Sequence, residues 1–144
     1  MLTMNDRLLS LHQICQQFEV DILYLFGSRA VEVQQWLTGQ REALSDSSSD
    51  VDIGVKSPPG VHFSLDEKVE LAIALEDFLD VGRVDLIYLP DADPFLAANV
   101  IRGERMYAQD TYRADEYDLY ILRRAGDLAY LERKRMALVL GKKI

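Results

Sequence analysis

The sequence predicts an α/β (α+β) domain in which a small mixed β-sheet is flanked by helices and followed by a long C-terminal helix. Short apolar, β-prone runs alternate with segments of helical periodicity, and the last thirty residues carry one extended helical pattern. Such alternation is typical of a single layered domain. A chain of 144 residues can bury its own core, so we expect one domain over 1–144. Its core covers about 5–110 and its closing helix about 114–140.

The first half of the chain alternates helix and strand. Val20 to Phe26 is a compact apolar run that ends at Gly27, which favours a buried strand. Apolar residues three and four apart before it, among them Cys15, indicate an amphipathic helix. In chain order we expect a helix over 6–18, a strand over 20–26, a helix over 30–37, a polar loop over 38–49 and a strand over 51–55.

The second half begins with a clear helix start. Ser64 and Glu67 have the spacing of a capping box, in which each side chain bonds the other residue's backbone N–H. The apolar run Val84 to Leu89 predicts an interior strand. The remaining elements are a helix from Ser64 to about Leu79, a strand over 84–89, a helix over 94–102, a short strand over 105–109, and a helix from Ala114 towards Leu140.

Charge is distributed unevenly along the chain. The net charge is −8, with −11 in residues 1–110 and +3 in residues 111–144. An acidic body argues against binding of a nucleic-acid backbone, so no direct nucleic-acid partner is expected. The basic end is consistent either with a partner surface or with a solvated helix face whose cations suit the helix dipole.

Several functional classes are excluded by composition. No apolar run approaches the roughly 20 residues that span a bilayer, and no cleavable signal pattern opens the chain, so a cytoplasmic location without membrane contact is expected. Cys15 is the only cysteine, which rules out an intrachain disulfide and a cysteine-rich metal site. His12 and His62 lie in a helix and a loop and are read as structural residues.

Gly27 and Ser28 form the first candidate site feature. They follow a buried strand directly and precede a helix. A glycine there lets the backbone approach a ligand, and the next helix presents its first amides to an anion. This junction is therefore a candidate phosphate cradle, with Arg29 as a nearby charge.

Asp50 and Asp52 form the second feature. Residues two apart on a strand project from the same face, about 6.5 Å apart. Two carboxylates there repel each other, and aspartate is unfavourable in strands. A divalent cation would relieve the repulsion, and magnesium suits carboxylate oxygens combined with phosphates and waters. The alternative is an exposed edge strand that tolerates two charges.

Asp85 is the third feature, because it is an acid at the start of an apolar strand. A position beside Asp50 and Asp52 would explain it. Three carboxylates around two magnesium ions would hold a triphosphate, neutralise the leaving pyrophosphate and activate an attacking hydroxyl.

These residues together resemble the polymerase β-like nucleotidyltransferases in their minimal (MNT) form. The resemblance lies in Gly27-Ser28 after the first strand, Asp50-Val51-Asp52 on the second and Asp85 on a later one, and it spans about residues 5–110. It implies that Gly27, Ser28 and Arg29 bind the nucleotide and that Asp50, Asp52 and Asp85 are the catalytic metal ligands. The 21 residues between Ser28 and Asp50 are about twice the family's usual spacing. The extra length, Val33 to Ser47, is expected to extend the helix after the Gly-Ser turn and to add a flexible, Ser-rich inserted loop.

The small size resembles most closely the stand-alone MNT antitoxins paired with HEPN-domain toxins. That resemblance implies a magnesium-dependent protein adenylyltransferase that moves AMP from ATP to a tyrosine of a HEPN ribonuclease encoded by the adjacent gene. It also implies a hetero-oligomeric complex in which the helix over 114–140 docks the partner. Two alternatives stay open: an antitoxin that neutralises its partner by binding without catalysis, and a small-molecule nucleotidyltransferase of the aminoglycoside-modifying kind.

Overall fold

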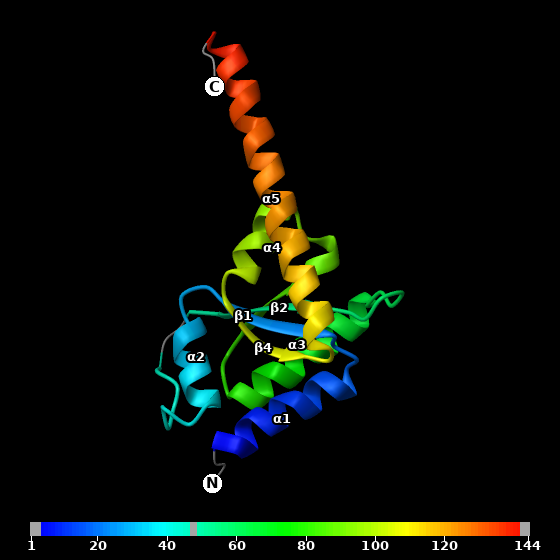
Figure 1. Ribbon diagram of the computed structural model, residues 1–144. Helices are drawn as coiled ribbons and strands as arrows, with labels where there is room; N and C mark the ends of the chain where they lie inside the picture. The colour runs from blue at the N-terminus through cyan, green and yellow to red at the C-terminus, as the bar shows by residue number, and fades with distance from the viewer. Residues whose placement is uncertain (1–3, 47–48, 142–144) are drawn as a thin grey trace.

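A computed structural model describes residues 4–46 and 49–141 of the chain (Figure 1). The elements follow the predicted alternation of helices and strands. They are α1 (Met4–Gln17), β1 (Ile22–Phe26), α2 (Ala30–Leu37), β2 (Val51–Lys56), α3 (Leu65–Leu79), β3 (Val84–Tyr88), the 3₁₀ turn η1 (Leu89–Asp91), α4 (Pro94–Ile101), β4 (Glu104–Ala108) and α5 (Thr111–Val139).

The four strands form one mixed sheet in the order β3-β2-β1-β4. β1 pairs antiparallel with both of its neighbours, whereas β2 and β3 run parallel. The carboxyl end of β1 therefore lies at the same edge of the sheet as the first residues of β2 and β3. The predicted mixed sheet is confirmed.

Helices cover the sheet on both faces. Alternate residues of β1 divide between two buried clusters, Leu23 and Leu25 in one and Tyr24 and Phe26 in the other. The first cluster packs under α1, α2 and α3, with Cys15 as one of its buried members. The second packs under α4 and the first half of α5, on the opposite face (Figure 1).

Local signals place the helix boundaries. The predicted capping box is present, since Glu67 donates its backbone N–H to the Ser64 hydroxyl and its carboxylate accepts the Ser64 N–H. α5 begins three residues before the predicted Ala114. Its first turn is fixed by Asp110, whose carboxylate accepts the backbone N–H of Arg113.

The prediction that Val84 to Leu89 forms an interior strand is wrong. β3 is an edge strand of the sheet, and its middle residues are only half buried. Its apolar composition has another cause: Leu86 packs against the cluster under α3, and Ile87 against the cluster under α4 and α5. An edge strand covered on both faces therefore has the composition of a central one.

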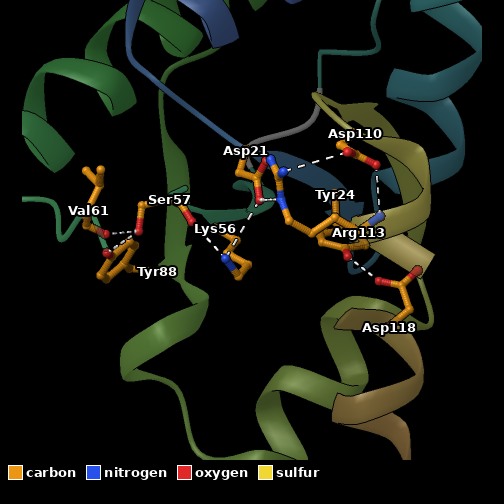
Figure 2. Close-up of polar contacts among 9 residues, drawn as sticks. All are labelled: Asp21, Tyr24, Lys56, Ser57, Val61, Tyr88, Asp110, Arg113 and Asp118. Carbon is orange, nitrogen blue, oxygen red and sulfur yellow. Dashed lines mark hydrogen bonds and ion pairs between the residues drawn. The ribbon is translucent and has the colours of Figure 1, made fainter. Parts of the chain in front are cut away.

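Polar contacts of Asp21 and Tyr24 help to fasten α5 to the sheet (Figure 2). Asp21, just before β1, is buried and forms ion pairs with Arg113 of α5 and, at 3.7 Å, with Lys56 at the end of β2. Further along, the buried Tyr24 hydroxyl donates a hydrogen bond to Asp118. The start of α5 is thus held to the same strand that leads to Gly27.

The predicted inserted loop is held by buried arginines. Arg7 of α1 donates to the backbone carbonyls of Trp36, Arg41 and Glu42 at 2.9–3.1 Å. Arg29 donates to the carbonyls of Ser45 and Ser49. The backbone of the described loop residues that these arginines contact is therefore held against the body of the domain.

Among the helices of the described residues, none combines the length and apolar character needed to cross a membrane.

Candidate active site

Asp52 and Asp85 are the closest pair of the predicted acids. They lie directly opposite each other in the parallel register of β2 and β3, where neighbouring strands are about 4.8 Å apart. Val51 and Ile53 on either side of Asp52 belong to the cluster under α3. Because side chains alternate along a strand, Asp52 and Asp85 both project from the other face, on the side of α4 and α5.

The electrostatics of Asp52 reflect this crowding. Burial, followed by the neighbouring carboxylates of Asp85 and Asp50, raises the pKa of the Asp52 carboxyl above its usual range. A hydrogen bond with Asp85 acts in the same direction. A carboxylate disfavoured by its neighbours gains from any cation that joins the group.

Gly27 brings the end of β1 against this acidic pair. Its φ of +78° lies in the left-handed region, which glycine adopts without steric cost. A β-carbon at this position would lie 2.1 Å from Oδ2 of Asp52. The glycine is therefore needed both for the turn and for the close approach to the carboxylate. Ser28 follows it, exposed, at the start of α2.

Asp50 lies beside the pair but has a different partner. Its Oδ2 is 3.6 Å from Nε of Arg83, the residue before β3. Within residues 4–46 and 49–141, no three acidic, histidine or cysteine side chains are already arranged to hold a metal ion. The structure thus brings Asp52 and Asp85 together and leaves Asp50 paired with an arginine at the rim. The assignment of all three acids as ligands stays a prediction.

Arg29 does not point into this site. It is buried, its Nε donates to Glu32 at 2.7 Å, and its remaining nitrogens bond the carbonyls of the inserted loop. These contacts give Arg29 a structural role that the sequence did not indicate. Its predicted role in nucleotide binding is not tested by them.

The donor set fits magnesium. It consists of carboxylates without imidazole or thiolate, which is what a hard cation prefers. Two of the carboxylates are adjacent, and burial together with the neighbouring carboxylates raises the pKa of Asp52, which a bound cation would offset. Asp52 and Asp85 would hold the ion, and Asp50 would join them by turning from Arg83.

Comparison with known families shows which family the chain belongs to. The model of the family described as Polymerase beta, Nucleotidyltransferase matches residues 10–112. This range contains all six predicted site residues. The chain belongs to this family. The predicted resemblance is thereby confirmed at the level of the family.

Solved structures share the fold of this nucleotidyltransferase. A complex of tri-AMPylated Shewanella oneidensis HEPN toxin with MNT antitoxin matches with a TM-score of 0.62 and 18% identity, over 95% of this chain and 96% of that one. A toxin–antitoxin structure with AMP-PNP matches with a TM-score of 0.63 and 20% identity, over 96% of each chain. A structure described as a putative minimal nucleotidyltransferase has 27% identity and a TM-score of 0.50, over 72% of this chain and 94% of that one.

A comparison with curated protein sequences found no match.

The structure adds one residue that the sequence did not single out. Arg83 is the only basic side chain of the described residues within ion-pair distance of Asp50, Asp52 or Asp85. The signal was present in the sequence, because Arg83 stands two residues before Asp85 at a strand start.

Proposed function

We propose that this nucleotidyltransferase is a magnesium-dependent protein adenylyltransferase that transfers AMP from ATP to a tyrosine of a HEPN-domain toxin and so acts as its antitoxin. The observation that carries the proposal is the adjacent pair Asp52 and Asp85 with the backbone of Gly27 packed against it. The fold supports it as well, because the similar structures include an AMPylated HEPN toxin bound to an MNT antitoxin.

The reaction requires few groups from the chain. The tyrosine oxygen forms a bond to the α-phosphorus of ATP, the α–β bridge breaks, and pyrophosphate leaves with the bonding electrons. Bound magnesium supplies charge neutralisation and lowers the pKa of the attacking hydroxyl. Ser28 and the first amides of α2 would bind phosphate oxygens next to Asp52. Asp85 would accept the hydroxyl proton.

The projecting half of α5 is the proposed docking surface for the toxin. Its last buried residue is Ala125, after which the helix extends beyond the domain (Figure 1). The face that packs on α4 continues outward with exposed apolar side chains, which need a partner to be buried. We define this docking face by Leu128, Leu131, Met136 and Val139. Basic residues beside it, such as Arg133 and Lys134, favour an acidic rim on the partner.

Docking and chemistry fall on the same side of the molecule. Asp52 and Asp85 project from the sheet face that α4 and α5 cover. A partner bound along the projecting half of α5 can therefore extend towards the acids without crossing the sheet. This supports a protein acceptor over a drug-sized one, which would need an enclosed acceptor pocket beside the acids.

Mass spectrometry tests the proposal directly. The protein is incubated with ATP, magnesium and the HEPN product of the neighbouring gene, and the toxin's mass is followed. We expect additions in steps of one AMP, located on tyrosine, and their loss with Asp52→Asn. A panel of aminoglycosides without the toxin should accept no AMP.

Two results would overturn the proposal. If a tight complex forms and the mass of the toxin does not increase, this protein neutralises the toxin by binding alone. Transfer that persists in Asp52→Asn would remove the proposed metal site. Asp66→Asn, on the exposed first turn of α3, is the matched control and should retain full transfer.

A further inference from the structure

Within the described residues the acidic site has a single basic neighbour, and the side chain of that neighbour is mostly exposed. The exposed fractions of the Arg83 and Asp50 side chains are 71% and 39%, and their closest contact is 3.6 Å. An ion pair this exposed adds little to stability, so it is easily broken. Asp52 and Asp85 have no ion-pair partner in the described part of the chain.

The backbone around Arg83 is fixed although its side chain is not. Its carbonyl accepts the N–H of Val51 at 3.1 Å, which ties it to the start of β2. The next residue, Val84, donates its N–H to Glu76 of α3 at 2.9 Å. The guanidinium is therefore carried on a rigid base at the rim of the acidic pair, with the freedom to turn towards a ligand.

We propose that Arg83 is a positioning and phosphate-binding residue: it holds Asp50 in the metal-free protein and turns to the triphosphate when a divalent cation binds Asp50. This inference rests on the proposed function. It assigns a nucleotide-binding role to a residue outside the Gly-Ser and Asp-x-Asp segments.

Simple electrostatics favours the exchange. A divalent cation and a guanidinium cannot both lie against one Asp50 oxygen without strong repulsion, so the arriving metal displaces Arg83. ATP then brings several negative oxygens to the same rim. The planar guanidinium can bind two phosphate oxygens at once. Its contact with Asp50 is a single long one of 3.6 Å. Arg83 thus weakens binding of the metal in the absence of nucleotide and strengthens binding of the metal–nucleotide complex.

The opposite signs of these two effects make the test specific. Mn²⁺ binding without nucleotide is measured by electron paramagnetic resonance, and binding of a non-hydrolysable ATP analogue with Mg²⁺ by calorimetry. For Arg83→Ala we expect tighter Mn²⁺ binding than in the wild type. We expect analogue binding about tenfold weaker, as for the loss of one charge-assisted hydrogen bond. Arg83→Lys should restore most of the analogue affinity, and Arg123→Ala, with the same charge loss on the exposed surface of α5, should change neither value.

The outcomes separate this inference from the function on which it rests. In one outcome the wild type binds Mn²⁺ and the analogue, and Arg83→Ala binds both with equal or lower affinity. This result would overturn the role of Arg83 but would leave the nucleotidyltransferase site supported. Wild-type protein that binds neither would overturn both. Tighter Mn²⁺ binding together with weaker analogue binding supports the exchange.

Discussion

At the scale of single residues, Gly27 couples backbone conformation to the position of a carboxylate. We predict that Gly27→Ala destabilises the fold by about 1–2 kcal/mol, the cost of a left-handed φ for a residue with a β-carbon. It should also abolish AMP transfer. The added methyl group would lie 2.1 Å from Oδ2 of Asp52, so the carboxylate would have to move. Thermal unfolding and the transfer assay measure the two effects.

Gly60 provides a matched control for this prediction. Its φ is +79°, but a β-carbon there meets nothing within 4 Å. Gly60→Ala should therefore cost similar stability and leave transfer intact. If the two variants lose activity equally, the contact with Asp52 is not the reason.

Glu32 is a second residue whose charge has a measurable consequence. Burial acts to raise its pKa, but hydrogen bonds from Ser45 and Arg29 outweigh it and lower the pKa from 4.5 to about 2. A depressed folded-state pKa means that the contribution to stability is present above about pH 4.5 and is lost as the pH falls through 2. We predict that Glu32→Gln lowers the melting temperature at pH 7 and that the difference from wild type shrinks below pH 4.5.

The control for Glu32 is Glu70→Gln, on the exposed surface of α3. It should leave the melting temperature at pH 7 nearly unchanged. A difference between Glu32→Gln and wild type that stays constant from pH 7 to pH 3 would contradict the role of the charge.

At the scale of elements, α5 joins a folded half to a projecting one. Its 29 residues extend about 43 Å, since each residue rises 1.5 Å. Only the first half contributes buried residues. Isolated helical turns without packing are marginally stable, so the projecting half gains most from a partner.

We predict that Leu131→Asp, on the docking face, weakens binding of the HEPN toxin at least about tenfold, because an aspartate would be buried at the interface. The Leu131 side chain is 56% exposed in the free protein, so folding should not change. Calorimetric titration with a catalytically inactive toxin measures the affinity. Leu119→Asp, at a side chain that is 60% exposed on the opposite face of α5, should bind normally. Equal loss in both variants would remove the proposed docking face.

At the scale of the whole molecule, the sheet separates a face covered by three helices from the face that carries the acidic pair. α1, α2 and α3 cover one face, and α4, α5 and the acidic pair share the other (Figure 1). The ion pairs of buried Asp21 hold the start of α5 at the opposite end of β1 from Gly27 (Figure 2).

We predict that Asp21→Ala lowers the free energy of unfolding by about 3 kcal/mol, because Arg113 and Lys56 lose a buried counter-charge. Urea denaturation measures this loss. Asp115 lies on α5, as Arg113 does, and is an exposed partner of Arg105 of β4. Asp115→Ala should therefore cost less than about 1 kcal/mol. Similar costs for the two variants would show that burial of Asp21 is unimportant.

Much of this architecture was predictable from local signals. The boundaries of α2 agree with the prediction at both ends, and α3 begins at its capping box. Such boundaries depend on interactions within a few residues, which the sequence contains directly. The interior position predicted for β3 was wrong. An apolar composition indicates that both faces of a strand are covered, but whether the strand lies at an edge depends on the strand order of the sheet.

The sequence by itself determined the element order, the mixed sheet and the family, because hydrophobic periodicity, caps and the Gly-Ser and Asp-x-Asp segments are local patterns. Only the tertiary structure decided which acids meet. The parallel register places Asp85 opposite Asp52, while Asp50 pairs with Arg83. The tertiary structure also directs the Arg29 side chain towards the backbone of the inserted loop. It leaves the second half of α5 without packing partners within the domain. These outcomes depend on strand order and on contacts between residues far apart in the chain, for which a single sequence carries no local signal.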